Sequence, residues 1–279
     1  MLRNLEAIHR PADLQEAVRL VQQTTAVPLG GGTQLLPASS PAVEAVVDLG
    51  RLGLTYVEVE MERVRVGATT SLQRFADDPA VQEMTQGIAG EAVRLVAARN
   101  IRGQATVGGM LAAGGGDHPL LAVLLVLEAL LTLHAPELRT VAVDSLLSYR
   151  ERMLGDGGLI SELSIPRPAE TAGWGMAHVG RTPRDRPIVF AVGRVVMTEG
   201  RCREVRLALS GVARRPVRLG QAEQHLCGAE PTPQRLEQAA GIAAAALAPP
   251  ADFRGSSEYR REMAAVLARR ALAQAVARY

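Results

Sequence analysis

The first part of the chain changes from helical to strand-like spacing of its apolar residues. Residues 14–21 place apolar side chains three or four positions apart. They follow an Asp13–Glu16 pair that is typical of a capping box, so a short amphipathic helix is predicted. Strands are predicted at 26–29 and 43–49, where apolar residues run together.

The middle of the chain predicts a hairpin and then helices. Residues 56–66 alternate apolar and polar positions on both sides of a charged turn, which is typical of a β-hairpin. Helices are predicted at 70–76 and 88–97. The apolar stretch 120–133 is shorter than the roughly 20 residues of a spanning helix and contains Glu128, so a buried helix followed by a buried strand is predicted.

The last third of the chain is predicted to form a separate α+β unit. A strand at 159–165 is closed by Pro166 and Pro168, and we place a domain boundary there. Further strands and helices are predicted beyond that point. The strands are expected at 187–197 and 203–210, and the helices at 219–226, 233–247 and 257–277.

Composition and charge favour a globular protein without a nucleic-acid partner. The chain has 279 residues and 47% hydrophobic content, which is enough for sizeable cores. Its 31 basic and 29 acidic side chains are mixed and leave a net charge of +2, so neither nucleic acid nor an anionic membrane is expected as a partner. No integral membrane segment is predicted. Residues 1–17 lack the apolar core of a secretory signal, and a cytoplasmic location is expected.

The two cysteines predict neither a zinc nor an iron–sulfur site. Cys202 and Cys227 have no further Cys or His nearby at metal-ligand spacing, whereas such sites need about three or four converging ligands. We expect no metal ligands in this chain, and two reduced, partly buried thiols. A disulfide or a reactive thiol is the alternative.

A first glycine segment follows the strand predicted at 26–29. In PLGGGTQLLP, three consecutive glycines permit positive φ and close approach of the backbone to a ligand. Several backbone N–H groups can then point at one phosphate, and Thr33 adds a hydroxyl donor. The alternative is a tight structural turn. The segment matches neither the P-loop pattern nor the spaced dinucleotide fingerprint.

A second glycine segment, ATVGGMLAAGGGDHPL, has the same chemistry and little periodicity, so a second loop is predicted. Thr106 supplies a hydroxyl, and Gly108 and Gly109 allow close backbone approach. Asp117 is either the N-cap of the following helix or a hydrogen-bond acceptor for a ribose or ribityl hydroxyl. His118 is interpreted as a partly exposed neighbour of that cap and not as a catalytic base.

Five motifs in a fixed order carry a resemblance that covers essentially the whole chain. They are GGGTQLLP, VGATTSL, RNIRGQATVGGMLA, VGRTPRDRPIV and DFRGSSEYRREMAAVLARRAL. In this combination the chain resembles the FAD-binding medium subunits of the molybdenum hydroxylases, such as xanthine dehydrogenase and aerobic carbon monoxide dehydrogenase. The resemblance implies an α+β fold. A two-subdomain FAD-binding domain of the vanillyl-alcohol-oxidase (PCMH) type would span 1–167, with subdomains at about 1–54 and 55–167, and a flavoprotein C-terminal domain 168–279.

The resemblance also implies which residues contact FAD. Asp117 would lie on the ribityl side, Ile160 would make an apolar contact near the flavin ring, and His178 stands where the family often has lysine. The two glycine segments would hold the diphosphate. Their residues are Leu29, Gly30, Gly31, Gly32, Thr33, Gln34, Thr106, Val107, Gly108, Gly109 and Met110.

The chain departs from the family pattern at several positions. Met110 replaces a common Asn or Ser, and the AAGGG stretch before Asp117 is shorter than usual. His178 puts a titratable group where a fixed charge is common, and Val96 replaces a phenylalanine that shields the flavin in some members. The charged stretch 181–186 is either a solvated loop or a docking surface near the flavin.

The expected function is electron transfer without catalytic residues of its own. The resemblance implies a subunit whose FAD passes electrons from iron–sulfur clusters to a terminal acceptor. Its partners would be a large molybdopterin subunit and a small iron–sulfur subunit, because this chain has no motif for either cofactor. Two alternatives stay open at this point. One is a stand-alone flavin oxidase of the same superfamily, and the other is a divergent structural subunit without FAD.

Overall fold

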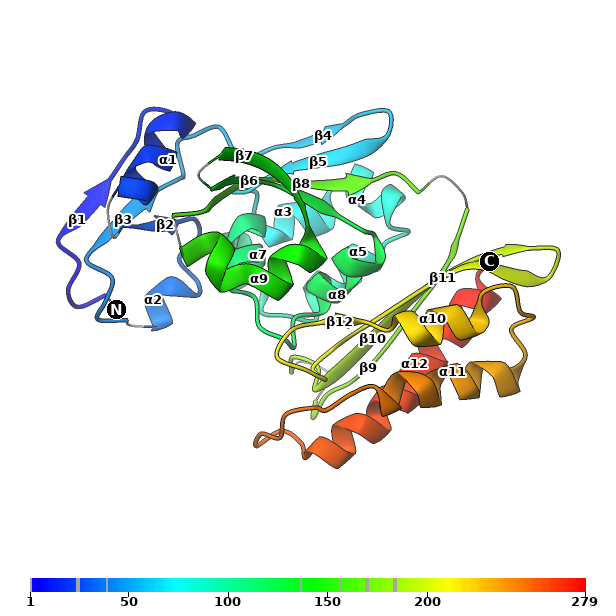
Figure 1. Ribbon diagram of the computed structural model, residues 1–279. Helices are drawn as coiled ribbons and strands as arrows, with labels where there is room; N and C mark the ends of the chain where they lie inside the picture. Colours follow the sequence, from blue (N-terminus) through cyan, green and yellow to red (C-terminus); the bar gives the residue numbers. More distant parts are fainter. Residues whose placement is uncertain are drawn as a thin grey trace. The chain divides into compact units, whose positions relative to one another are not determined.

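The structure is a computed structural model in which two compact units are described (Figure 1). The first unit is made of 1–81, 98–114 and 128–167, and the second of 82–97, 115–127 and 168–279. Both units mix helices and sheets, which confirms the α+β class. The domain boundary after residue 167 stays a prediction. The residues described are 2–23, 26–38, 40–135, 137–155, 157–168, 171–182 and 185–279.

A small parallel sheet begins the first unit. Its strand order is β1-β3-β2, and helix α1 (Leu14–Gln23) packs Ala17 and Val21 against Val47. The predicted capping pair is confirmed, since the Glu16 N–H donates to Asp13 Oδ1 at 2.8 Å. The bounds are Ala7–His9 for β1, Val27–Leu29 for β2, Leu35–Ala38 for helix α2 and Ala45–Asp48 for β3.

An antiparallel five-stranded sheet, in the order β4-β5-β8-β6-β7, forms the rest of the first unit. The predicted hairpin is confirmed by the pairing of β4 with β5. The strands are β4 Val57–Val59, β5 Arg63–Gly67, β6 Leu130–Ala135, β7 Glu137–Ala142 and β8 Leu159–Pro166. The accompanying helices are α3 Leu72–Asp77, α6 Arg99–Gln104, α7 Val107–Ala113 and α9 Val143–Gly155. Helix α4 (Pro79–Met84) begins in the first unit, whose first segment ends at Val81.

The second unit is built on a four-stranded antiparallel sheet in the order β12-β11-β10-β9. Helix α12 packs on β9 and β10, α11 packs on α12, and the fully buried α8 packs on β10 and β11. The strands are β9 Gly173–Val179, β10 Val189–Thr198, β11 Arg201–Ser210 and β12 Val217–Arg218. The helices are α5 Ile88–Arg94, α8 Pro119–Val126, α10 Gly220–Leu226, α11 Pro233–Ala245 and α12 Ser257–Ala277.

Strand β9 was missing from the sequence prediction, and its glycines explain why. A Cβ on Gly173 would overlap the carbonyl oxygen of Ala275, and one on Gly175 would overlap that of Ala271. Helix α12 therefore lies directly on the backbone of β9. The strand needs residues without side chains on that face, which removes the apolar alternation that identifies a strand.

Candidate functional site

The two glycine segments meet within the first unit. A Cβ on Gly30 would lie 2.7 Å from Thr106 Oγ1, and one on Gly31 would overlap the carbonyl oxygen of Gln104. Real Cβ atoms do not approach so closely, so only glycine allows the backbones to pack here. The structure thus brings together two segments more than 70 positions apart, as the sequence predicted.

The first segment presents a row of backbone donors. In the hydrogen bonds among the described residues, the N–H groups of 30–34 donate to no protein acceptor. Gly30 and Gln34 are exposed and the three residues between them are partly exposed. Gly32 has φ +70°, a left-handed conformation that turns the chain into α2. Successive N–H groups around such a turn form a concave anion-binding nest.

The second segment is not a loop, and that prediction was wrong. Thr106 is the N-cap of α7, and its Oγ1 accepts a hydrogen bond from the Gly109 N–H at 3.1 Å. Helix α6 occupies the residues just before it. Neither helix was predicted, because both contain glycine. Glycine has a low helix propensity, which tertiary packing can override.

The N–H groups at the start of α7 are already hydrogen-bonded inside the protein. Val107 donates to the Thr70 carbonyl at 2.9 Å and Gly108 donates to the Ala68 carbonyl at 2.8 Å. The Met110 N–H completes the first turn with the Thr106 carbonyl at 2.9 Å. The second segment therefore offers few free N–H donors to a ligand.

The other three expected contacts lie in different surroundings. Ile160 belongs to β8 of the first unit, pairs with Leu133 and is 5% exposed. His178 is exposed on β9 of the second unit, and partial desolvation lowers the pKa of its imidazole. Asp117 also belongs to the second unit.

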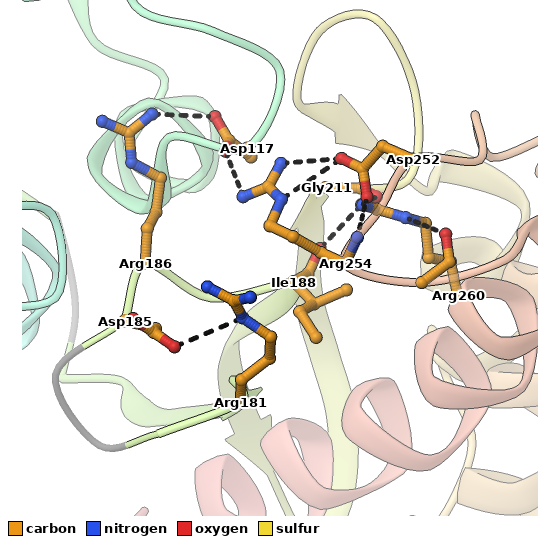
Figure 2. Close-up of polar contacts among 10 residues, drawn as sticks. Asp117, Arg181, Asp185, Arg186, Ile188, Gly211, Asp252, Arg254 and Arg260 are labelled. Atoms are coloured by element: carbon orange, nitrogen blue, oxygen red, sulfur yellow. Dashed lines mark hydrogen bonds and ion pairs between the residues drawn. The ribbon is translucent and has the colours of Figure 1, made fainter.

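Asp117 does not cap helix α8, which excludes one of its two interpretations. The N-cap is His118, and it makes no side-chain cap bond. His118 is buried, so the expectation of a partly exposed neighbour of the cap was wrong. Asp117 Oδ1 instead accepts from Arg186 Nη1 at 3.2 Å, and its Oδ2 accepts from Arg254 Nη1 at 2.8 Å (Figure 2). Burial alone would raise the pKa of this carboxyl, but the charges of Arg186 and Arg254 outweigh burial and hold the pKa below its usual value.

The segment that carries Arg254 is itself held in place. Asp252 accepts from the Arg254 backbone N–H at 2.8 Å and from Arg260 Nη2 at 2.6 Å. Arg260 is 2% exposed, and its Nη1 donates to the carbonyls of Ile188 and Gly211. The DFRGSSEYRR motif contributed to the family resemblance, but these roles of its charged residues were not predicted. Its closely spaced opposite charges are the sequence feature that could have indicated them.

The charged stretch at 181–186 divides into two parts. Arg181 pairs with Asp185 at 3.4 Å and lies over the exposed ring of Phe253, 5.5 Å from its centroid. Arg186 turns toward Asp117 instead. Arg184 lies outside the described residues. Part of the stretch is thus a surface loop, as one interpretation predicted, and part belongs to a partly buried network.

Other candidate chemistry is limited in the described part of the chain. Cys202 is buried, which raises the pKa of its thiol to about 11, whereas Cys227 is exposed, so the expectation that it is partly buried was wrong. Across the described ranges, no three His, Cys, Asp or Glu side chains are grouped to hold a metal ion. No helix found there has the length and apolar character needed to cross a membrane.

The geometry of the first segment fits a diphosphate. Five consecutive N–H groups without protein acceptors are a donor set for several phosphate oxygens, and the absence of Cβ atoms lets the ligand approach the backbone. Each unmet N–H would otherwise depend on water. The residues present therefore suit the diphosphate of FAD.

Comparison with known protein families matches nearly the whole chain. Residues 3–168 match the family described as the FAD binding domain in molybdopterin dehydrogenase, and residues 177–275 match the CO dehydrogenase flavoprotein C-terminal domain. The predicted architecture of an FAD-binding domain followed by a flavoprotein C-terminal domain is thereby confirmed.

Individual relatives and solved structures agree with these matches. The carbon monoxide dehydrogenase medium chain of Hydrogenophaga pseudoflava is 30% identical over 97% of this chain and 96% of its own. The nicotine 6-hydroxylase medium subunit of Paenarthrobacter nicotinovorans is 31% identical, with 96% of each chain covered. The solved carbon monoxide dehydrogenase of H. pseudoflava has a TM-score of 0.90 at 28% identity, covering 100% of this chain and 99% of that one.

Proposed function

The chain belongs to the FAD-binding, medium subunits of the molybdopterin dehydrogenases, and we propose that its first glycine segment binds the FAD diphosphate. The row of unengaged N–H groups at 30–34 carries this proposal. These donors are fixed by the packing of Gly30 and Gly31 on the second segment, so little order has to be gained on binding.

The remaining predicted contacts take different parts in this proposal. Thr33 adds a hydroxyl donor, and Thr106 packs against Gly30 and so helps to hold the first segment in position. The contacts proposed for Val107 to Met110 rest on the family resemblance. Ile160 is buried on β8, and its proposed contact near the flavin ring rests on the family resemblance. For Asp117 and His178 the proposal rests on the family resemblance.

The chain is one component of a larger oxidoreductase, in line with its family. Its relatives include the medium chain of a carbon monoxide dehydrogenase, the medium subunit of a nicotine 6-hydroxylase and a subunit of the 6-hydroxypseudooxynicotine dehydrogenase complex. We propose as partners a large molybdopterin subunit and a small iron–sulfur subunit. Bound FAD supplies the electron-transfer chemistry, and the protein holds and orients it. The chain would thus pass electrons from iron–sulfur clusters to a terminal acceptor.

We also propose a cytoplasmic location, because both Cys202 and Cys227 are free thiols. Fractionation of the native cell tests this placement. Recovery of the chain outside the cytoplasm would overturn it without affecting the cofactor proposal.

The visible spectrum of the purified chain tests FAD binding directly. We expect flavin absorbance and release of FAD, not FMN, on denaturation. Purification from the native source should also recover the two partner subunits. A colourless protein that does not bind added FAD would contradict the cofactor proposal, and oxidase turnover by the isolated chain would contradict its role as a component.

A further inference from the structure

The two cysteines of the chain are distant in sequence, but the fold of the second unit places them side by side. Cys202 lies on β11, and Cys227 is the C-cap of α10. Gly228 then takes a left-handed φ of +77°, which turns the chain back toward β11. There the Gly228 N–H donates to the Cys202 carbonyl at 2.7 Å, and the Cys202 N–H donates to the Ala229 carbonyl at 2.9 Å.

This backbone pairing limits the separation of the two cysteines. With standard backbone dimensions, the bond from the Gly228 N–H to the Cys202 carbonyl leaves the Cα atoms of Cys202 and Cys227 at most about 7.5 Å apart. A disulfide spans about 4.4–6.8 Å between Cα atoms. The Cys227 sulfur also donates to the carbonyl of Arg203 at 3.9 Å, so it lies against the residue that follows Cys202. Arg201 Nη1 holds the same turn through the Gly228 carbonyl at 3.1 Å.

The two thiols differ in their access to solvent. Cys227 is exposed, whereas Cys202 is buried in the apolar core that β11 shares with α10 and α11. Burial, and next the charge of the nearby Cys227, raise the pKa of Cys202 to about 11, so Cys202 stays a protonated thiol near neutral pH. Because the thiolate is the nucleophile, a dissolved oxidant reacts with Cys227 first.

We propose that Cys202 and Cys227 are a redox modification site, where hydrogen peroxide closes a reversible disulfide. The Cys227 sulfur attacks one peroxide oxygen, the O–O bond breaks, and Cys227 becomes a sulfenic acid while water leaves. The Cys202 sulfur then attacks the Cys227 sulfur, the S–O bond breaks, and the hydroxyl leaves as water with the proton of Cys202. Two thiols are thereby oxidised and one peroxide is reduced to two waters.

The disulfide would join β11 covalently to the end of α10. In the reducing cytoplasm proposed above, the pair rests as two thiols and closes transiently, as redox-sensing disulfides of that compartment do. The site goes beyond the proposed function, because it stands whether or not the first glycine segment binds FAD.

Exposure of the full-length protein to hydrogen peroxide tests the site. The chain has two cysteines, so the oxidation products are readily assigned. After the sample is unfolded in N-ethylmaleimide, mass spectrometry counts the thiols that remain and finds linked peptides. In the parent chain we expect both thiols to be lost in equal amounts and their two peptides to be linked, and we expect dithiothreitol to restore both thiols.

Two matched variants separate the two steps of the reaction. Cys202→Ala should leave Cys227 as a sulfenic acid that dimedone traps, because no neighbouring thiol resolves it. Cys227→Ala should keep Cys202 as a thiol under the same exposure, because Cys202 is fully buried. Melting curves show whether each variant still folds.

The result that overturns the proposal is read on the parent chain and does not depend on the folding of a variant. It is oxidation of Cys227 alone, with Cys202 still alkylated after unfolding. A disulfide that joins two copies of the chain, seen as a dimer on a non-reducing gel, would overturn it equally.

Discussion

The two glycine segments of the first unit are similar in composition but differ in how their backbones are used. In the segment at 30–34, the N–H groups donate to no acceptor among the described residues, and they lie at or near the surface. In the segment at 106–110, the corresponding donors are bonded to Ala68, Thr70 and Thr106, and Gly108 is buried. In the first segment, glycine allows close packing and leaves the N–H groups without protein acceptors, whereas in the second segment the N–H groups are used within the protein.

This difference shows why glycine content alone does not identify a phosphate site. A glycine is required wherever a backbone must approach another group closely, whether that group is a ligand or another part of the chain. The distinguishing property is the hydrogen-bond state of the N–H groups. We therefore expect substitutions in the first segment to affect FAD binding, together with stability where they disturb the contact between the segments, and substitutions in the second segment to affect mainly stability.

The largest effect is expected for Gly31→Ala, which would break the contact between the segments. The new Cβ overlaps the Gln104 carbonyl oxygen, and backbone atoms have to move. We expect a loss of about 3 kcal/mol in the free energy of unfolding and no retained FAD. Urea denaturation and the visible spectrum measure the two effects.

Gly103→Ala is the matched control, because nothing lies within 4 Å of its new Cβ. It should leave FAD bound and add about 0.5–1 kcal/mol of stability, since alanine favours the helix. If Gly31→Ala and Gly103→Ala had the same unfolding free energy and retained the same amount of FAD, the contact between the segments would be contradicted.

Gly108→Ala tests the packing role of the second segment. Its Cβ would lie 2.8 Å from the Cβ of Ala68 and 3.0 Å from the Ala68 carbonyl oxygen. We expect a loss of about 2 kcal/mol in unfolding free energy and a smaller change in FAD affinity. Adding Ala68→Gly should restore part of the stability. If Gly108→Ala kept the stability of the parent chain but lost FAD, the second segment would act in binding and not mainly in packing.

Thr106→Ala removes the N-cap of α7, and we expect it to cost about 1 kcal/mol of stability. Gly30→Ala places a Cβ 2.7 Å from Thr106 Oγ1, so it should be destabilising in the parent chain and better tolerated together with Thr106→Ala. A double-mutant cycle in urea measures this coupling, expected at about 1 kcal/mol. If the changes in unfolding free energy of the two substitutions were strictly additive, a contact between position 30 and the Thr106 side chain would be contradicted.

Thr33→Val tests binding without a change in packing. Thr33 is only partly buried, so its hydroxyl can be replaced by a methyl group with little effect on unfolding. We expect FAD binding to weaken by about 1 kcal/mol, the contribution of one hydrogen bond. Thr33→Ser keeps the hydroxyl and should bind FAD as the parent does. Titration of the FAD-free chain with FAD distinguishes the two variants.

The smallest effect is a dependence on acid pH. Residues 30–34 and 106–110 cannot produce it, because they have no titratable side chains. Burial would raise the pKa of Asp252, but the Arg254 N–H and Arg260 lower it to about 2. A folded-state pKa below the ordinary value means that the stabilisation is present above about pH 4 and is lost as the pH falls toward 2. Since Asp252 is partly solvated, we expect at most about 1 kcal/mol.

Asp252→Asn should abolish this part of the pH dependence in thermal melts. A parent chain whose stability stays level from pH 4 to pH 2 would show that the network around Asp252 contributes no such stabilisation.

Local features of the chain were predictable from its sequence. The capping pair Asp13 and Glu16, the hairpin of β4 and β5 and the long helix α12 depend on residues close together, and all three were confirmed. The order of the motifs predicted the family and both of its domains, which the comparisons confirmed. These results depend on spacing and residue type, which the linear chain contains in full.

Only the tertiary structure determined the packing roles of the glycines and the pairing of charged residues that are distant in sequence. Helix α7 and strand β9 were not predicted, because their glycines are required by packing partners that are distant in sequence. The glycine of α7 packs on Ala68, and those of β9 pack on helix α12. The partners of Asp117 are 69 and 137 positions distant. Local propensity contains no information about such contacts, and the bonding state of an N–H group depends on which acceptor the fold brings to it.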